Sequence, residues 1–326
     1  MQAARLLAAS AVSLAAALMP AVATAQAQDY PNKPVKIIVS FSAGGTTDVI
    51  ARQIAQRLTH HWGQPVVVEN KPGAGGTLGT DYTANQPADG YTILMSSSGP
   101  MVISPSLPKK LATDPLTAMV PVILVADVAN VLVTAPELNI KSMQELVQKG
   151  KVNPGSLNYA STGVGTVAHL SGAAFSEKAG IQTIHVPYKG AEAVRDVMAG
   201  RVQFMFATLP SVLGNIKGGK LTALGQVAPA RVKALPDVPT MKEHGIEGMD
   251  AGSWFGLFVA KGTPQPIIDK INSQVAAILK EQDTLDALEK QGATPVGGTA
   301  QYFADLVRRD YEGWKPVIQR TGAGAN

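Results

Sequence analysis

The stretch from Val35 to Asp48 constrains the fold most, because three structural signals follow one another in it. An apolar run that begins at Val35 predicts a buried strand, and the pair Gly44 and Gly45 predicts a tight turn. The polar residues up to Asp48 are typical of the first turn of a helix. A strand that leads through a glycine turn into a helix is the unit from which α/β folds are built.

The same glycine turn is a candidate binding site for an anion. Gly44 and Gly45 leave backbone amides uncovered by side chains, and the helix that follows adds unpaired N–H groups and the positive end of its dipole. A purely structural explanation stays open, because every strand-to-helix connection needs a turn and glycine is common in turns. The anion hypothesis therefore needs support from the rest of the sequence.

Residues 1–27 differ in composition from the rest of the chain. Arg5 is their one charged residue, an apolar run covers residues 6–19, and Ala-x-Ala sites end at Ala25 and Ala27. This pattern is typical of a secretory signal peptide, and the apolar run is too short to span a bilayer. We expect cleavage after Ala27, with Ala25 as the alternative site.

The composition predicts an exported bacterial protein with a core large enough for two domains. The chain has 326 residues, of which 45% are hydrophobic and 16% charged. It contains no cysteine, which excludes a bacterial lipoprotein anchor and favours the periplasm for an exported core without disulfides. The net charge of +4, the scattered Lys and Arg, and the 5% aromatic content favour small anions as ligands and predict no nucleic-acid binding.

Strand and helix patterns alternate along the mature chain at spacings typical of βαβ units. We therefore predict an α/β protein with parallel sheets and helices on their faces. The apolar run from Val120 to Val125 is expected to be the strand that leaves the first domain. Capping signals mark several helix starts: Ser142 with Glu145, Thr240 with Glu243, and Thr263 as the N-cap of a long helix with Pro264 at its first position.

Two further polar loops follow predicted strands. Ser96, Ser97 and Ser98 come directly after the strand Tyr91–Met95, at the strand end where open α/β sheets bind ligands, although a solvated serine turn explains them equally well. The segment Asn158–Thr166 repeats the order of the opening stretch: a strand, a Ser/Thr/Gly turn and a helix start. Two such corners, one in each domain, could face each other.

Cofactor and metal sites have little support. Gly163–Ala168 fits the dinucleotide pattern G-x-G-x-x-G/A, but the acidic residue that this motif requires is missing from Thr183–Tyr188, and exported proteins seldom meet free NAD. The five histidines have no metal-ligand spacing. We therefore predict no cofactor and no metal. His169 either buttresses the Asn158–Thr166 loop or is an ordinary packed or surface histidine.

A serine hydrolase is the alternative from another functional class. Ser98 or Ser161 with His169 and Asp48 would supply the residue types of a catalytic triad. No G-x-S-x-G motif occurs, however, and nothing in the order or spacing of these residues supports such a grouping. We therefore predict a binding protein without catalytic residues.

A set of short motifs extends over nearly the whole mature chain. It comprises the two glycine loops above and the segments Tyr30–Pro34, Val68–Gly76, Ala88–Tyr91, Asp114–Pro115, Val186–Gly190, Leu235–Thr240 and Ser253–Gly256. Together these motifs resemble the Bug family, the extracytoplasmic solute receptors of tripartite tricarboxylate transporters.

This resemblance implies a type II periplasmic binding protein, a clamshell of two α/β domains around a ligand cleft. It implies that residues 28–125 and 229–326 form a discontinuous domain 1 and that residues 126–228 form domain 2. In the family, two strand-to-helix loops hold a carboxylate through main-chain amides and ordered waters. The corresponding loops here are Phe41–Asp48 and Ser161–Thr166.

From the resemblance and the polar strand ends we expect a set of ligand-binding residues. Asp48 is expected to orient amides or to bridge water, or else to be only a helix N-terminal acid worth about 0.3 to 1 kcal/mol. Phe41 is expected to wall the cleft, whereas core packing suits Trp254 better. The expected set is Phe41, Ser42, Ala43, Gly44, Gly45, Thr46, Asp48, Ser98, Ser161, Thr162, Gly163, Thr166 and Ala207.

The chain departs from the family's usual sequence in two places. Many members have Pro-Phe-x-x-Gly-Gly in the first loop, where this chain has Ser40 in place of the proline and Ser42 and Ala43 before the glycines. Where a later Asp-Asn pair is common, it has Ala207 and Thr208. The missing acid argues against a ligand with an ammonium group and favours simple mono- or dicarboxylates with an aliphatic or aromatic body.

The resemblance therefore predicts a monomeric periplasmic receptor that captures an organic carboxylate and delivers it to the membrane permease subunits of a tripartite tricarboxylate transporter. Signalling stays an alternative, because the same receptor could present its ligand to a membrane sensor kinase. An exported ester or amide hydrolase is the remaining alternative.

Overall fold

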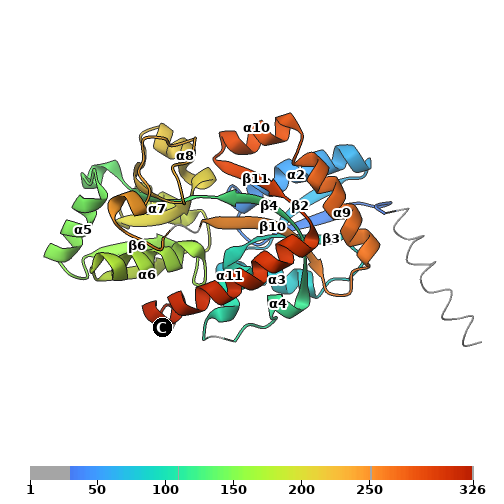
Figure 1. Cartoon of the computed structure of the whole chain (residues 1–326), viewed down its shortest axis with the longest axis horizontal. Coiled ribbons are helices and arrows are strands. Elements are labelled where there is room, and N and C mark those ends of the chain that lie inside the picture. The colour runs from blue at the N-terminus through green and yellow to red at the C-terminus, as the bar shows by residue number, and fades with distance from the viewer. Residues whose placement is uncertain (1–29, 109, 250–251, 325–326) are drawn as a thin grey trace, which may run out of the picture.

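The computed structural model describes residues 30–108, 110–249 and 252–324, so the signal peptide predicted at residues 1–27 lies outside the described residues. The described chain forms two lobes, each built around one sheet with helices packed against it (Figure 1). Within these ranges, no helix is both long enough and apolar enough to cross a membrane.

The first lobe contains a six-stranded sheet. Its strands are β1 (Val35–Val39), β2 (Val66–Asn70), β3 (Thr92–Ser97), β4 (Met119–Val128), β10 (Ser253–Ala260) and β11 (Ala293–Gly297). They lie in the order β11-β4-β10-β3-β1-β2. β1 pairs in parallel with β2 and β3, whereas β10 is antiparallel to β3 and β4, and β11 is antiparallel to β4.

The second lobe contains a five-stranded sheet. Its strands are β5 (Asn130–Thr134), β6 (Leu157–Ser161), β7 (Thr183–Pro187), β8 (Phe204–Thr208) and β9 (Thr222–Val227). They lie in the order β7-β6-β8-β5-β9. β6 is parallel to β7 and β8, whereas β5 is antiparallel to β8 and β9.

Both sheets are therefore mixed, and the prediction of parallel sheets is correct only for the βαβ units. The chain leaves the first sheet through β4, continues after Ala129 into β5, and later returns from β9 to β10. A helical crossover makes the next strand parallel, but a strand that passes directly between lobes is free of that constraint. The predicted domain boundaries, at residues 125/126 and 228/229, fall near these two crossings and stay a prediction.

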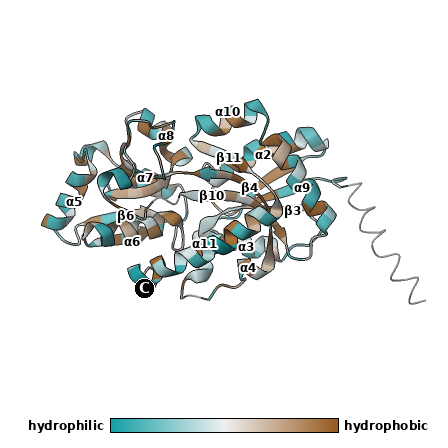
Figure 2. Cartoon of the chain, viewed as in Figure 1, coloured by the Kyte–Doolittle hydropathy of each residue, from teal (hydrophilic) through white to brown (hydrophobic). Residues whose placement is uncertain are grey.

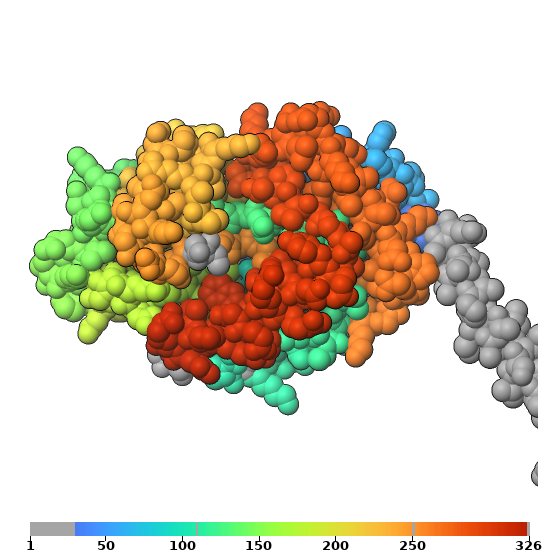
Figure 3. All heavy atoms as spheres, in the orientation of Figure 1, coloured from blue at the N-terminus to red at the C-terminus, as the bar shows by residue number. Residues whose placement is uncertain are grey.

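Helices cover both sheets (Figure 1). On the first lobe lie α2 (Thr46–Trp62), α3 (Thr77–Ala84), α4 (Pro115–Ala118), α9 (Gln265–Ile278), α10 (Gln282–Lys290) and α11 (Ala300–Thr321), and on the second α5 (Met143–Val152), α6 (Val167–Ala179), α7 (Glu192–Met198) and α8 (Leu209–Lys217). α11 also extends under the second lobe, where Arg320 pairs with Glu177 of α6 at 2.9 Å (Figures 1 and 3). Short single-turn helices are η1 (Ala74–Gly76), η2 (Gly99–Ile103), η3 (Ser104–Ser106), η4 (Pro136–Leu138) and η5 (Lys242–His244).

The predicted capping signals are present, with shifts in their partners. Ser142 Oγ accepts the Glu145 amide, but the Glu145 carboxylate accepts from the Lys141 amide instead of closing back on Ser142. The prediction for Thr263 is wrong by one residue. Its hydroxyl donates to the Ala260 carbonyl within the turn after β10, so Pro264 becomes the N-cap of α9.

The reciprocal capping box of Thr240 and Glu243 is complete, with bonds of 3.2 Å and 2.7 Å between each backbone amide and the other residue's side chain. It opens only the short helix η5 and no longer helix. The capping box of Thr240 and Glu243 therefore formed as predicted, while the length of the helix depended on the residues after the box.

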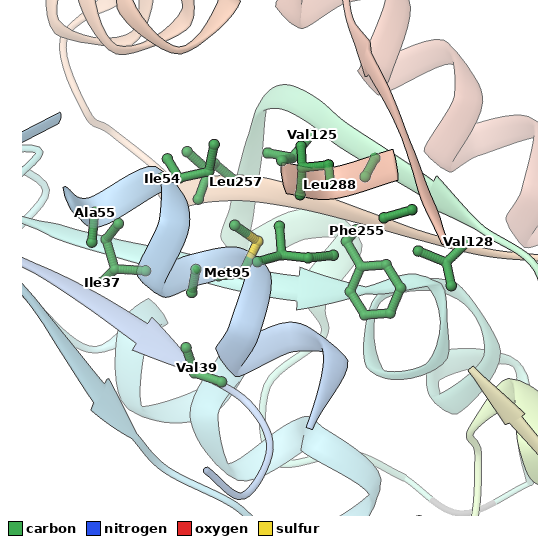
Figure 4. Packing of buried hydrophobic residues seen from close by; sticks show 14 of the residues in the cluster. Ile37, Val39, Ile54, Ala55, Met95, Val125, Val128, Phe255, Leu257 and Leu288 are labelled. Atoms are coloured by element: carbon green, nitrogen blue, oxygen red, sulfur yellow. The ribbon is translucent and has the colours of Figure 1, made fainter. Parts of the chain in front are cut away.

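The core of the first lobe explains why these elements form. The apolar stripe of α2, with Ile50, Ile54 and Leu58, is completely buried against the sheet, while the outer faces of the helices are hydrophilic (Figures 2 and 4). Trp254 packs in a second cluster against Phe303, with ring centroids 5.2 Å apart, and its indole N–H donates to Asp310. Core packing is therefore the role of Trp254, as expected.

Candidate functional site

A cavity of about 260 Å³ lies between the two lobes and is lined by residues of both sheets. The first lobe contributes the loop between β1 and α2 together with the ends of β3 and β10. The second contributes the loop between β6 and α6, one face of α7, and the ends of β8 and α8. The lining residues are Phe41, Ser42, Gly44, Gly45, Thr46, Thr47, Ser97, Asn130, Thr162, Thr166, Val167, Ala168, Gly190, Ala191, Val194, Arg195, Met198, Met205, Phe206, Thr208, Ser211, Asn215, Ser253 and Phe255.

The first loop is held in shape by Asp48 from behind. The Gly44 amide, which has φ of +80°, donates to Asp48 Oδ2 at 2.9 Å. Arg52 Nε donates to Oδ2 at 3.0 Å, and Asn70 Nδ2 donates both to Oδ1 and to the Phe41 carbonyl at 2.9 Å. Asp48 is buried and does not line the cavity, so it organises the loop that carries the amides.

The electrostatics of Asp48 follow from these contacts. Burial by itself would raise the pKa of the carboxyl group, but the hydrogen bonds from Arg52, from the Gly44 amide and from Asn70 outweigh it and hold the pKa below its usual value. The carboxylate is therefore ionised at neutral pH. Its charge is neutralised locally by Arg52, which leaves the loop able to accept an anion.

The second loop is held by hydrogen bonds within itself. Ser161 Oγ accepts the Gly163 amide at 3.1 Å, and Thr166 Oγ1 donates to the Gly163 carbonyl at 2.8 Å and accepts the His169 amide. Gly163 and Gly165 both have positive φ, at +135° and +80°. Thr162 and Thr166 line the cavity, whereas Ser161 and Gly163 form the supporting layer behind them.

Two stacked histidines support this loop from the side away from the cavity. The rings of His169 and His185 lie 4.1 Å apart; the Gly165 amide donates to His169 Nδ1, and His185 Nε2 is 2.7 Å from Ser161 Oγ. Burial lowers the pKa of His169 to about 4; burial, helped by the neighbouring His169, lowers the pKa of His185 to about 3. Both rings are therefore neutral at pH 7, and His169 does buttress the loop.

The two lobes touch on several sides of the cavity. Thr46 Oγ1 and Thr208 Oγ1 are 2.7 Å apart, and Ser42 Oγ donates to the Lys189 carbonyl at 3.4 Å. Gly75 of η1 packs against the backbone of Gly163 and Val164, so that a Cβ atom at Gly75 would collide with the Val164 carbonyl oxygen. The described arrangement is thus a closed clamshell.

The structure brings most of the predicted loop residues to one place. Phe41, Ser42, Gly44, Gly45, Thr46, Thr162 and Thr166 line the cavity. The other predicted residues do not: Ala43 is an exposed residue of the first loop, Asp48, Ser161 and Gly163 support the loops, Ala207 is buried in the core, and Ser98 is buried with its Oγ lacking a hydrogen-bond partner. Ligand binding by any of them stays a prediction.

Several lining residues were missed by sequence reasoning. Asn130 Nδ2 donates to Ser253 Oγ at 3.1 Å, and this pair joins the first residues of β5 and β10 at the crossings between the lobes. No local motif could have indicated the pair. Arg195 had a sequence signal, because Ala191, Val194, Arg195 and Met198 follow the i, i+3, i+4, i+7 spacing of one helix face.

The hydrogen bonds do not link the residues of the hydrolase alternative. Ser161 contacts His185 and not His169, and the Ser161 side chain is fully buried among backbone groups. Asp48 belongs to the other lobe, where Arg52 and Asn70 occupy its oxygens. Among the residues that the structure describes, no group of three His, Asp or Glu side chains is placed to hold a metal ion.

Two further hollows lie where α11 of the first lobe meets the second lobe, away from the first glycine loop. One of about 350 Å³ is lined by α6 and α11, and one of about 700 Å³ lies between β7, α6 and the end of α11. Although both are larger than the cavity of about 260 Å³, neither contains residues of both glycine loops. The smaller cavity between the lobes is therefore the candidate site, because only there do both loops meet.

Comparisons with known proteins agree with this geometry. Residues 50–323 match the family model described as tripartite tricarboxylate transporter family receptor. The protein BugT of Bordetella pertussis is 39% identical over 307 residues, which cover 92% of this chain and 93% of BugT.

Two solved structures of similar proteins hold small organic acids. The R. palustris protein Rpa4515 with adipate is 33% identical, with a TM-score of 0.88 over 90% of this chain and 99% of that one. MatC from Rhodopseudomonas palustris with bound malate is 30% identical, with a TM-score of 0.85 over 89% of this chain and 100% of that one.

Proposed function

The chain belongs to the family of tripartite tricarboxylate transporter receptors, which are periplasmic solute-binding proteins, and we propose that it captures a small organic carboxylate in the cavity between its lobes. The ligand carboxylate would lie where the loops Phe41–Asp48 and Ser161–Thr166 meet. The proposed client is the membrane permease of a tripartite tricarboxylate transporter. The proposed location is the periplasm, after removal of the signal peptide.

The observation that carries the proposal is the convergence of two helix starts on one cavity. The residues Gly45 and Thr46 at the start of α2, and Thr166 and Val167 at the start of α6, line it from opposite lobes. Each helix start supplies unpaired amides and a positive dipole end. Two such ends that face one small volume favour a carboxylate over a neutral or cationic group.

The rest of the lining suits the body of an organic acid. Phe41, Val194, Met198, Met205 and Phe255 supply apolar surface. No acidic side chain is among the described lining residues, so a ligand ammonium group would find no carboxylate partner there. The volume of about 260 Å³ lies just below the range of about 300 to 1,000 Å³ that is typical of ligand sites. The adipate and malate of the two neighbours are of this class.

Binding would act through closure of the clamshell. The ligand would bind first to the loop of the first lobe, and the second loop would complete the site when the lobes close. The contacts between Gly75 and Val164 and between Thr46 and Thr208 form only when the lobes meet. The closed form then differs in surface from the open one. That difference is what a permease can recognise.

A thermal-shift screen tests the proposal. The mature protein is unfolded and refolded to remove ligand carried through purification, and then heated with mono- and dicarboxylates or with the matching neutral amides. A ligand at about 100 times its Kd stabilises the folded state by about 2.7 kcal/mol, which raises Tm by about 5 to 10 °C. The amides should give no shift. A screen in which no carboxylate raises Tm would contradict the proposal.

A further inference from the structure

We propose that Arg195 makes this receptor selective for dicarboxylates by pairing with the ligand's second carboxylate, at the end away from the glycine loops. The inference rests on the proposed function and concerns the specificity of the same cavity. Arg195 carries a charge in a cavity lining whose other described residues are uncharged.

Arg195 is the only charged side chain among the described residues that line the cavity. It lies on α7 of the second lobe, on the face that also carries Ala191, Val194 and Met198 into the lining. Its side chain is 66% exposed, which places it where the cavity opens to solvent. A cation at this opening adds to the positive dipole ends at the loops, so the cavity offers two separate positive regions.

The guanidinium of Arg195 is held only weakly by its partner within the protein. Its ion pair with Glu192 Oε1 is long, at 3.9 Å. By contrast, Arg52 binds Asp48 through Nε and NH2 at 3.0 and 2.9 Å, and Arg201 binds Asp196 through Nε and NH2 at 3.1 and 2.8 Å. An arginine fork matches a carboxylate in two parallel hydrogen bonds. Arg195 can therefore exchange a weak partner for a ligand carboxylate at little cost.

Apolar side chains share the cavity lining with Arg195. Val194 and Met198 flank it on α7, and Phe41 and Phe255 line the same cavity from the other lobe. A ligand with an apolar chain and a carboxylate at each end satisfies all of these groups. A monocarboxylate of the same length would instead lay its apolar end against the guanidinium and displace water from it without giving a hydrogen bond in return.

The alternative role for Arg195 is that of a solvated surface charge with no influence on the ligand. The two roles differ in what they predict for pairs of ligands. A surface charge acts through the long-range field, which salt screens, so its removal changes the affinity for a dianion by about the square of the factor for a monoanion. A direct partner changes affinity for the dicarboxylate alone, and only when the second carboxylate is present.

Calorimetric titration of the refolded mature protein separates these roles. The probes are three pairs of equal chain length: succinate and butanoate, adipate and hexanoate, suberate and octanoate. The variants are Arg195→Gln, which removes the charge, and Arg195→Lys, which keeps the charge but loses the fork. Lys217→Gln on α8, exposed and outside the cavity lining, is the control for net charge.

We expect the wild type to prefer at least one dicarboxylate over its monocarboxylate. Arg195→Gln should weaken binding of that dicarboxylate about tenfold and change binding of the monocarboxylate less than about twofold, because it removes a charged hydrogen-bond donor at a partly solvated site. Arg195→Lys should recover part of the loss, and Lys217→Gln should have no effect.

Two results would overturn the inference while leaving the proposed function intact: a wild type that prefers the monocarboxylates, or an Arg195→Gln variant whose loss of affinity for a dicarboxylate is no larger than the square of its loss for the matching monocarboxylate. If no carboxylate binds the wild type, the proposed function itself fails, and that outcome is distinguishable from the others.

Discussion

Gly75 in the first lobe lies against the carbonyl oxygen of Val164 in the second, so closely that a Cβ atom at Gly75 would collide with that oxygen. Gly163 approaches the same point from its own side, and a Cβ atom there would lie 2.9 Å from the Gly75 Cα. The lobes can therefore close in this way only because Gly75 and Gly163 have no side chains. The glycine-rich segment after β2 serves as a contact surface between lobes and not only as a turn.

The Gly75→Ala substitution should hold the clamshell open. The added methyl group keeps the loops apart, so the binding-competent closed state becomes less populated and the apparent Kd for a bound carboxylate rises about tenfold or more. Small-angle X-ray scattering with ligand should show a larger radius of gyration than that of the wild type. Gly155→Ala is the matched control, because Gly155 also has positive φ, +78°, but has no atom within 4 Å of the added Cβ. Equal Kd values for the two variants would contradict a contact role.

The Asp48→Asn substitution should destabilise the first loop. It replaces a buried ionised acceptor of hydrogen bonds from Gly44, Arg52 and Asn70, at a cost of about 1 to 3 kcal/mol. Urea unfolding at pH 7 measures this loss, with Asp305→Asn on exposed α11 as a control that should change stability by less than about 0.5 kcal/mol.

The lowered pKa of Asp48 also determines how the free energy of unfolding depends on pH. Because the folded-state pKa of Asp48 lies below its unfolded value of about 3.9, its contribution is fully present above that value and is lost as the pH falls through the folded pKa. The difference between wild type and Asp48→Asn should therefore shrink when unfolding is measured toward pH 3 and below. A difference that stays constant between pH 7 and pH 2 would rule out a role for the charge.

The stacked histidines predict a second pH dependence, at higher pH. His169 and His185 have folded-state pKa values of about 4 and about 3, while the unfolded value is about 6.5. Below pH 6.5 the unfolded chain binds protons that the folded protein excludes. The free energy of unfolding therefore decreases as the pH decreases, by about 1 to 2 kcal/mol for each ring at pH 5 after allowance for solvent screening. Thermal unfolding between pH 7 and pH 5 should show a smaller decrease for His185→Asn than for the wild type. His60→Asn, at an exposed position, should keep the wild-type slope.

An acidic side chain at position 208 should weaken the binding of a carboxylate ligand. Thr208 lines the cavity and contacts Thr46 across the lobes, whereas its neighbour Ala207 is buried in the core. The Thr208→Asp substitution places a negative charge beside the ligand and should raise the Kd of a carboxylate at least about tenfold, since like charges in an interface cost several kcal/mol. Thr208→Asn has nearly the same shape and no charge, so it should bind much more tightly than Thr208→Asp. Similar affinities for both variants would place the ligand elsewhere.

Much of the candidate site was predictable because its chemistry is local. The sequence Gly44-Gly45 favours a tight turn between a strand and a helix, and Thr166 caps its own helix within three residues. The amides of Gly44 and Gly45 are themselves bonded to Asp48 and to the Ser42 carbonyl, so the unpaired amides lie at the helix start after them. These signals depend on bonds within a few residues. They correctly led to two loops that line one cavity.

The alternation of strands and helices, the glycine loops and the family motifs were thus set by sequence alone, because backbone geometry and capping act over short distances. Only the tertiary structure decided which residues line the cavity beside those loops and which support the loops from the protein interior. Asp48 and Ser161 turned inward to hold backbone amides. Asn130, from a segment without a motif, and Arg195, from a helix whose spacing marked a face but not what that face would meet, came to line the cavity. The physical reason is that a cavity wall is made by side chains that meet across two lobes, and the path of the chain through β4–β5 and β9–β10, not any local pattern, brings those side chains together.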